Sequence, residues 1–398
     1  MGPRCRFRPQ DRQTDREKCL MALRAIDTDI HAVVPASSIE LRLPQPWKLR
    51  FSMGDRGPGS LGYWNPNGVM RRDAVAPDGR RVEGDPHLLA RHFFDVHDLE
   101  YGILNFTGPA LNLGLSPDPM YAAAVATAAN DAVVEEWLPV DERFYGSITV
   151  TPNNPEAAAA EIRRLGHEER MPQVLMVSGA RMPMGQAWFH PIYEACAEVG
   201  KPIAIHPGSE GVGISGPPTA VGYPTNYLEW HTDLVGSYIG HLVSMVTEGV
   251  FVKYPNLRFV LIEGGVSWLP PILWRLDKNW KALRQTAPWL ERPPSEYVYE
   301  HVLLTTQPIE EPEPIGFLHQ MLAMFPAEHM LMFATDFPHW DNDMPDFTAR
   351  LIPEHLRRNV MSETARRLYR LPAPAPMSDN PGPTLLQVSE QQGIKFME

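Results

Sequence analysis

Four short apolar runs in this sequence each end in side chains that can bind a metal ion or transfer a proton. These side chains are Asp29 and His31 after ALRAI, His206 after KPIAI, Glu263 after LRFVLI, and Asp336 after HMLMFAT. If the runs are neighbouring strands of one parallel sheet or barrel, their polar ends converge in space. Imidazole and carboxylate ligands around an open coordination position suit a catalytic divalent metal. The pattern therefore predicts a metal-dependent enzyme.

The segment DTDIH places its charged side chains at alternate positions. In an extended strand, positions i and i+2 point the same way, so Asp29 and His31 can reach one cation. Alternatively, Asp27 and Asp29 cap a following turn and His31 is structural. The recurrence of His206 and Asp336 at the ends of later runs favours the metal site.

Strand-like and helix-like segments alternate along the chain, which indicates repeated β/α units with parallel strands. We expect strands near residues 25–31, 101–106, 144–150, 173–178, 201–206, 257–262, 301–306 and 329–335. We expect helices near residues 87–100, 120–138, 155–166, 190–200, 231–253, 269–284 and 353–370. Eight strands in order is the number in a β/α barrel.

The predicted barrel spans residues 25–370 and carries a long Pro/Gly-rich insertion at about residues 35–86. Such long segments inside compact domains are usually functional or disordered. Ordered structure is favoured here by the aromatic residues Trp47, Phe51, Tyr63 and Trp64. Residues 1–24 predict a solvated N-terminal tail, of which the first twenty residues are expected to be dispensable. The proline-rich residues 371–398 predict an extension over the surface or a partner subunit.

The composition excludes several classes of protein. A net charge of −12 and a pI of about 5.6 argue against nucleic-acid binding, which needs a clustered basic face. Three cysteines without a CxxC pair predict neither a disulfide framework nor a cysteine zinc site. The chain lacks a signal-like apolar start and any run of about 18 apolar residues. We therefore expect a cytoplasmic enzyme that acts on a small molecule and binds no membrane.

The segments IDTDIH, IAIHPG, LRFVLIEGG followed by WLP, and FATDFPH resemble markers of the amidohydrolase superfamily. The resemblance is to the branch that contains aminocarboxymuconate semialdehyde decarboxylase and related aromatic-acid decarboxylases. It implies a distorted TIM-type β/α barrel with one divalent metal at its mouth. Carried over to this sequence, the implied ligands are Asp29, His31, His206 and Asp336.

Two positions depart from the family pattern. Asp29 replaces the first histidine of the commoner HxH, which adds negative charge; zinc remains the expected metal and manganese the alternative. Glu263 stands where many members carry a catalytic histidine, and it can transfer a proton if burial raises its pKa. Alternatively, Glu263 anchors a loop through the amides near Gly264 and Gly265. Asp336 is the second expected acid/base group, since a carboxylate beside a metal can orient or deprotonate a bound water.

Three further side chains are candidate substrate contacts. His339 follows the last ligand, Gln307 follows the run HVLLTT, and Arg181 could hold a substrate carboxylate by two hydrogen bonds. An ordinary surface position is the alternative for each. His231 and His241, in the predicted helix 231–253, are expected to be structural.

The leading hypothesis is a metal-dependent decarboxylase of a small carboxylated aromatic or unsaturated acid. An acid, Asp336 or Glu263, would protonate the carbon as carbon dioxide leaves. The alternatives are a hydrolase of an ester, lactone or amide on the same ligands, and a metal-free, non-catalytic barrel. A homodimer is also expected because the insertion is aromatic and a tryptophan-rich segment could cover a partner. Its tryptophans are Trp268, Trp274, Trp280 and Trp289.

Overall fold

The computed structural model describes residues 24–59, 61–63, 71–208 and 210–373. Its eight strands form one sheet in which each strand pairs in parallel with the next along the chain. The strands are β1 (Ile26–Ala32), β2 (Tyr101–Phe106), β3 (Phe144–Thr149), β4 (Gln173–Val177), β5 (Ile203–His206), β6 (Phe259–Leu261), β7 (Val302–Thr305) and β8 (Leu331–Met332). The predicted TIM-type α/β barrel is confirmed.

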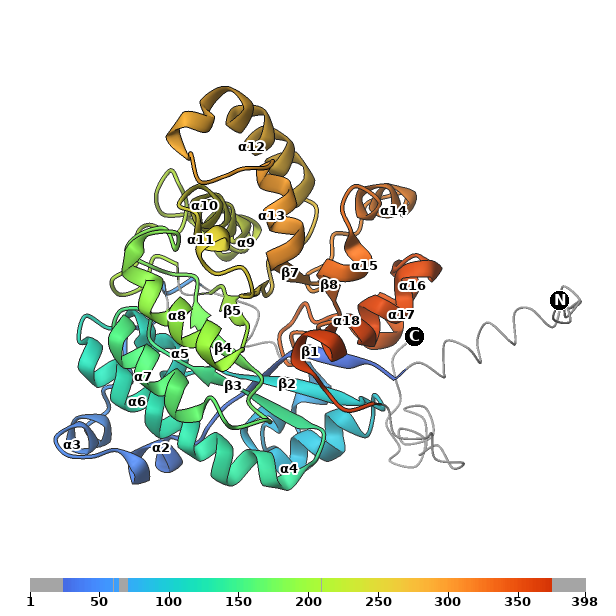
Figure 1. The fold of residues 1–398 in the computed structure, drawn as a ribbon. Helices are drawn as coiled ribbons and strands as arrows, with labels where there is room; N and C mark the ends of the chain where they lie inside the picture. Colours follow the sequence, from blue (N-terminus) through green and yellow to red (C-terminus); the bar gives the residue numbers. More distant parts are fainter. Residues whose placement is uncertain (1–23, 60, 64–70, 209, 374–398) are drawn as a thin grey trace, which may run out of the picture.

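Helices surround the strands (Figure 1). In the first half of the chain they are α2 (Ala36–Arg42), α3 (Trp47–Ser52), α4 (Pro86–Leu89), α5 (Pro109–Asn112), α6 (Pro119–Ala132), α7 (Pro155–Leu165) and α8 (His190–Val199). In the second half they are α9 (Tyr227–Thr232), α10 (Val235–Thr247), α11 (Val250–Lys253), α12 (Leu269–Leu283), α13 (Pro294–His301), α14 (Gly316–Leu322), α15 (Ala327–Met330), α16 (Pro345–Leu351), α17 (Glu354–Arg358) and α18 (Thr364–Tyr369).

The interior of the barrel is a packed apolar cluster. All eight strands contribute to it, with Ile26, Ile103, Tyr145, Leu175 and Val177, Ala204, Val260, Leu303 and Met332 in strand order. Ala365 and Tyr369 of α18 and the following Leu371 belong to the same cluster and close the end where the strands begin. The strands are buried on both faces, which explains why they are nearly continuous apolar runs in the sequence.

The barrel closes irregularly between β1 and the segment after β8. Backbone hydrogen bonds run from Thr28 N to Phe333 O at 3.0 Å and from His31 N to Phe337 O at 2.7 Å. The buried Asp27 carboxyl accepts from Thr335 Oγ1 at 2.6 Å, from Thr335 N at 3.0 Å and from Asp29 N at 3.1 Å. Burial raises the pKa of Asp27 to about 8, so this carboxyl is neutral at pH 7.

Several predicted elements differ in extent from those in the structure. The expected helix 231–253 is three helices, α9, α10 and α11, with Gly249 in the left-handed region at a φ of 78° between the last two. The expected strand 329–335 pairs with β7 only over Leu331–Met332, because the amide of Phe333 turns away to Val360 O. The expected helix 353–370 contains a π-helical turn, Asn359–Glu363, between α17 and α18. The helix expected at 87–100 ends as a π-helical turn, Ala90–Phe94.

The described part of the insertion is ordered against the barrel. Phe51 is fully buried, and Trp47 packs with its ring centroid 5.7 Å from that of Tyr121. Tyr63 donates a hydrogen bond from its hydroxyl to Pro224 O in the segment that follows β5. Trp64, the N-terminal tail up to residue 23 and the C-terminal extension from residue 374 lie outside the described residues.

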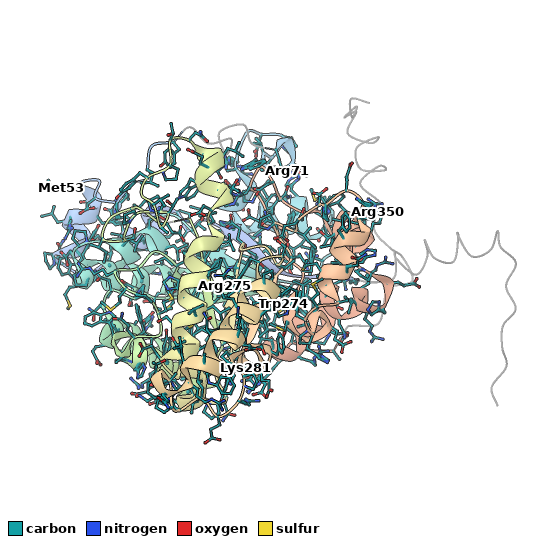
Figure 2. All side chains as sticks on the ribbon, turned by 90° about the horizontal axis from the view of Figure 1, so that it is seen from above. Met53, Arg71, Trp274, Arg275, Lys281 and Arg350 are labelled. Atoms are coloured by element: carbon teal, nitrogen blue, oxygen red, sulfur yellow. The ribbon has the colours of Figure 1, made fainter. Side chains whose placement is uncertain are left out.

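The tryptophan-rich segment is partly turned outward. Trp268 and Trp280 pack against the core, whereas Trp274 is 56% and Trp289 is 42% exposed. Trp274 lies on the outer side of α12 with the basic side chains of that helix (Figure 2). The homodimer stays a prediction. Across the described residues, none of the helices combines the length and the apolar character needed to cross a membrane.

We predict that Asp27 stabilises the barrel closure through its hydrogen bonds and not through charge. Asp27→Ala leaves three buried donors without an acceptor and should lower the free energy of unfolding by about 3 kcal/mol. Asp27→Asn keeps the shape of the neutral carboxyl and should cost less than about 1 kcal/mol. Urea denaturation of both variants at pH 7 checks this. An alanine variant as stable as the asparagine variant would contradict it.

Candidate metal centre

Five buried side chains converge at the carboxyl ends of the strands. One ligating atom from each lies within 4.8 Å of all the others, and the residues are Asp29, His31, His206, Glu263 and Asp336. Asp29 and His31 occupy alternate positions of β1, and His206 is the last residue of β5. Glu263 and Asp336 follow β6 and β8. The structure thus brings together the four residues predicted as ligands and the predicted acid/base residue.

The donor atoms face a common point. His31 Nε2 lies 3.1 Å from His206 Nε2 and 2.7 Å from Asp336 Oδ1. Asp29 contributes Oδ1 at 3.8 Å from His31 Nε2 and Oδ2 at 3.8 Å from His206 Nε2. Glu263 Oε2 lies 3.3 Å from His206 Nε2. Two imidazole nitrogens and three carboxylate groups therefore meet in one small volume.

The backbone aims several of these groups. His206 Nδ1 lies 2.8 Å from Pro207 O, which selects the tautomer with the proton on Nδ1 and a lone pair on Nε2. Burial, followed by the neighbouring His31, lowers the pKa of His206 to about 3, so the ring is neutral. Glu263 and Asp336 have left-handed φ values of 56° and 60°. Such values are uncommon for residues other than glycine and are concentrated at functional sites.

The residues present fit a divalent cation. Asp29 Oδ2 and Asp336 Oδ1 are buried and accept no hydrogen bond among the described residues, although Asp336 Oδ1 lies 2.7 Å from His31 Nε2 and the other oxygen of each carboxylate has a partner. Buried carboxylate oxygens without partners are costly unless a cation coordinates them. Two imidazole rings and two carboxylates form a donor set that suits zinc, manganese or iron.

His339 and Asp336 form an ion pair beside the ligands. His339 Nδ1 lies 2.7 Å from Asp336 Oδ2, and its ring centroid lies 4.1 Å from that of His31. Burial lowers the pKa of His339, but the Asp336 carboxylate outweighs burial and raises it to about 9. Burial raises the pKa of Asp336, but His339 and His31 outweigh it and hold this pKa well below its usual range. Asp336 is therefore ionised, and His339 carries a positive charge.

Glu263 has the opposite character. Burial raises its pKa well above the usual range, and the charges of Asp336 and Asp29 raise it further. Its surroundings therefore favour the protonated form of the carboxyl group. The amides beyond the glycine pair are bound by Glu310, which accepts from Val266 N at 3.2 Å and from Ser267 N at 3.0 Å. The anchoring role considered for Glu263 thus belongs to Glu310, and Glu263 faces the imidazoles.

Beside Glu263 lies a group of residues that the sequence did not assign to the centre. His231, expected to be structural, lies with Nε2 3.9 Å from Glu263 Oε1 and 3.4 Å from Asp341 Oδ2. The Tyr227 ring stacks on it at a centroid distance of 5.3 Å, and the Trp340 ring lies at 5.7 Å. The clustering of acidic and aromatic residues in TDFPHWDND was the sequence signal for Trp340 and Asp341. No sequence signal placed His231 beside them, because α9 was not predicted as a separate helix.

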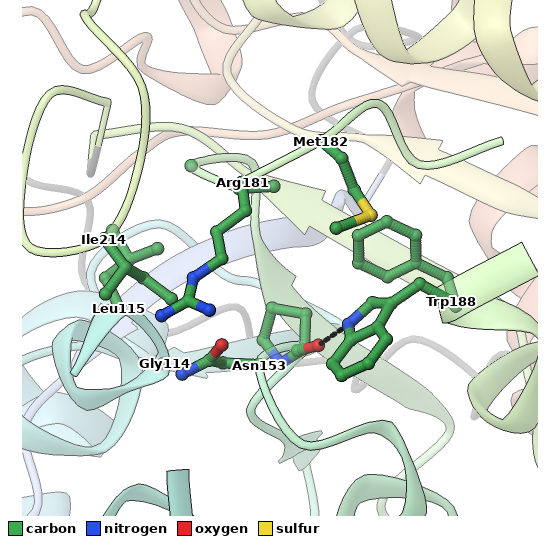
Figure 3. A pocket seen from close by; sticks show the side chains of 11 residues that line it. Gly114, Leu115, Asn153, Arg181, Met182, Trp188 and Ile214 are labelled. Atoms are coloured by element: carbon green, nitrogen blue, oxygen red, sulfur yellow. Dashed lines mark hydrogen bonds between the residues drawn. The ribbon is translucent and has the colours of Figure 1, made fainter. Parts of the chain in front are cut away.

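The other two predicted substrate contacts have different settings. Gln307 is fully buried and donates from Nε2 to Asp341 O at 3.2 Å, while its Oε1 has no partner among the described residues. Arg181 is exposed and lines a pocket formed by segments that follow β2, β3, β4 and β5. Figure 3 shows its guanidinium group near Asn153 and Gly114, with Trp188 on the other side. None of the five converging residues lines this pocket.

His241 has the structural setting that was expected. It is buried, its Nδ1 accepts from Met184 N at 3.2 Å, and its Nε2 lies 2.7 Å from Ser178 O. Both ring nitrogens are thus bonded to backbone groups outside the centre.

A family model described as Amidohydrolase matches residues 26–371. Gamma-resorcylate decarboxylase from Rhodococcus jostii is 26% identical over 301 residues, which cover 70% of this chain and 85% of that protein. The 2-amino-3-carboxymuconate-6-semialdehyde decarboxylase from Dictyostelium discoideum is 25% identical over 244 residues, covering 61% of this chain and 63% of that protein.

Solved structures of related proteins share the fold. The 5-carboxyvanillate decarboxylase from Sphingomonas paucimobilis matches with a TM-score of 0.61 and 23% identity, covering 88% of this chain and 100% of that chain. The 5-carboxyvanillate decarboxylase from Novosphingobium aromaticivorans was crystallised with manganese and 4-hydroxy-3-methoxy-5-nitrobenzoic acid. It matches with a TM-score of 0.63 and 21% identity, covering 88% of this chain and 97% of that chain.

We predict that the purified chain binds one divalent cation and that His206→Ala weakens this binding by more than about 100-fold. A loss of that size exceeds the effect of removing a residue that only orients a ligand. Isothermal titration of the metal-stripped protein with Mn²⁺ and with Zn²⁺ measures the affinity. His301→Asn is the matched control, because His301 is buried against Phe251 and lies outside the cluster. Equal affinities in the wild type and in His206→Ala would rule out this centre.

Proposed function

The chain belongs to the amidohydrolase family, and from that premise we propose that it is a metal-dependent decarboxylase of a small aromatic acid. One observation carries the proposal: Glu263, a buried carboxyl group whose pKa is raised by burial and by the neighbouring carboxylates, lies against a cluster of side chains that fits a divalent cation. A carboxylate-binding cation beside an acid is what decarboxylation needs, since a carboxylate must be held while the adjacent carbon gains a proton.

The relatives support the substrate class. Their names describe decarboxylases of gamma-resorcylate, which is 2,6-dihydroxybenzoate, and of 5-carboxyvanillate. These compounds are small aromatic acids with oxygen substituents. We therefore infer that this chain acts on a carboxylated phenol or a close relative of one.

The ligands for the cation are Asp29, His31, His206 and Asp336. When bound, the cation supplies positive charge that holds the substrate carboxylate or a neighbouring oxygen. The two carboxylates suit manganese, a harder ion than zinc, and the Novosphingobium relative was crystallised with manganese. We propose manganese as the working ion and keep zinc as the alternative.

Glu263 serves as the acid. It delivers the proton of its carboxyl group to the ring carbon that bears the substrate carboxylate. The bond between this ring carbon and the carboxylate carbon then breaks, its electron pair returns to the ring, and carbon dioxide leaves. Glu263 regains a proton from solvent on the side of His231, whose Nε2 lies 3.9 Å from Glu263 Oε1.

The remaining groups orient the substrate. The positive charge of His339 keeps Asp336 ionised and attracts the anionic substrate to this side of the centre. Tyr227 and Trp340, which pack about His231, present aromatic faces against which a substrate ring can stack. Gln307 offers its unpartnered Oε1 as an acceptor for a hydroxyl group.

Hydrolysis of an ester, lactone or amide on the same residues is the second candidate. The ionised state of Asp336 favours it, because this carboxylate can take a proton from an attacking water. The two candidates differ in the residue that must act first. Decarboxylation needs the proton on Glu263, and hydrolysis needs the free carboxylate of Asp336.

We predict that the manganese-loaded enzyme releases carbon dioxide from 2,6-dihydroxybenzoate or a 5-carboxyvanillate-like phenol. In D₂O the product should carry one deuterium at the carbon that lost the carboxylate. Glu263→Gln should lower kcat by about 100-fold or more while the protein still binds Mn²⁺, because only the transferable proton is lost. Carbon dioxide capture and mass spectrometry of the product check this.

Glu161→Gln is the control for that variant. Glu161 is a buried carboxylate like Glu263, but it pairs with Arg164 on α7, outside the centre. It should keep kcat within about twofold of the wild type, as expected for a site distant from the chemistry. Turnover of esters or lactones alone would establish the hydrolase instead, and a full rate in Glu263→Gln would remove Glu263 from the mechanism.

A further inference from the structure

A chain of buried hydrogen bonds crosses the inside of the barrel and ends on Asp29. Asn105 Nδ2 donates to Asp29 Oδ1 at 2.8 Å. Asn105 Oδ1 accepts from Ser147 Oγ at 2.7 Å and from Gln173 Nε2 at 3.1 Å. Gln173 Oε1 accepts from the Tyr369 hydroxyl at 2.7 Å. The chain therefore joins β1, β2, β3, β4 and α18.

All of these side chains are out of contact with water. Asp29, Asn105, Ser147 and Gln173 are fully buried, and Tyr369 is 5% exposed. In such surroundings a lost partner is not replaced by solvent, so each bond constrains the next one strongly. The bonds lie among the apolar residues of the barrel interior, to which Tyr369 itself belongs.

The direction of every bond follows from its two ends. An ionised Asp29 only accepts, so Asn105 must turn its NH₂ group towards Asp29 and its oxygen away. That oxygen then needs donors, and Gln173 provides one with its NH₂ group, which also donates to Ser147 Oγ at 2.9 Å. The Gln173 oxygen is left facing α18, where the Tyr369 hydroxyl donates to it. Reversing either amide would place two acceptors against each other.

We propose that this chain positions Asp29 for metal binding, with Tyr369 as the residue that anchors its far end. The proposal rests on the proposed function, because it assigns Asp29 to the metal. Asn105 holds Asp29 Oδ1, which leaves Oδ2, the oxygen without a partner, for the cation. Tyr369, Gln173, Ser147 and Asn105 are positioning residues, and they touch neither substrate nor cation.

The consequence is that a helix at the far end of the barrel affects the metal affinity. In Tyr369→Phe, Gln173 Oε1 is left buried without its donor, so Gln173 is held less firmly against Asn105, and Asn105 less firmly against Asp29. We expect Mn²⁺ to bind about 10-fold more weakly, the low end of the range for residues that orient a ligand. Asn105→Leu removes the contact with Asp29 itself and should weaken binding by about 100-fold.

Tyr193→Phe is the matched control. Tyr193 is a fully buried tyrosine of α8 whose hydroxyl donates to Met184 O at 2.5 Å, with no connection to the chain. Both tyrosine variants lose one buried hydrogen bond and should show comparable falls in Tm. Only Tyr369→Phe should change the Mn²⁺ affinity measured by isothermal titration and the electron paramagnetic resonance spectrum of the bound Mn²⁺.

A double variant separates the chain from general loosening of the fold. If Tyr369 acts through Asn105, Asn105→Leu with Tyr369→Phe should bind Mn²⁺ no more weakly than Asn105→Leu alone. Should Asn105→Leu fail to fold, the comparison of Tyr369→Phe with Tyr193→Phe decides. Equal Mn²⁺ affinity in the wild type, Tyr369→Phe and Tyr193→Phe would overturn the positioning role while leaving the metal centre intact. Absence of Mn²⁺ binding in the wild type would instead overturn the proposed function.

Discussion

Three carboxyl groups and two imidazole rings converge in a barrel whose interior is apolar. One ligating atom of each group lies within 4.8 Å of all the others. Like charges this close repel strongly, and burial removes the water that would screen them. The pKa values of the three carboxyl groups shift in different directions. Burial raises the pKa of Asp29 to about 6 and raises that of Glu263 well above its usual range, while the imidazoles keep Asp336 ionised. A divalent cation offsets the crowded negative charge, so the same crowding that disfavours the empty cluster favours a metal.

The rest of the barrel serves to hold these groups in place. The short ladders of β6 and β8 end early, which lets Glu263 and Asp336 turn inward with left-handed backbone angles. The closure between β1 and the segment after β8 brings the Asp336 amide to Asp29 O at 3.0 Å, so two of the candidate ligands are fixed to each other through the backbone. Supporting bonds of this kind decide whether a site is accurate enough to bind and react.

The order of the strands was predictable because each strand is a local apolar run and parallel strands are buried on both faces. The four candidate ligands were predictable for the same reason, since they stand where such runs end. The break of the predicted helix 231–253 into α9, α10 and α11 was not predictable, and with it the place of His231 was lost. Arg181 was a candidate contact for a substrate carboxylate, with an ordinary surface position as the alternative. It is exposed and lines a pocket that contains none of the five converging residues.

The sequence by itself determined the family, the number of strands and the kinds of donor atoms at their ends, because these depend on short-range patterns that neighbouring residues carry. Only the tertiary structure decided which carboxyl group has its pKa raised and which has it lowered. Glu263 and Asp336 are both carboxylic acids after apolar runs. Their difference arises because His31 and His339 each lie 2.7 Å from a carboxylate oxygen of Asp336, whereas the charges of Asp336 and Asp29 act on Glu263. Electrostatic interactions of this kind depend on separations in space between residues far apart in the chain, and no local pattern contains them.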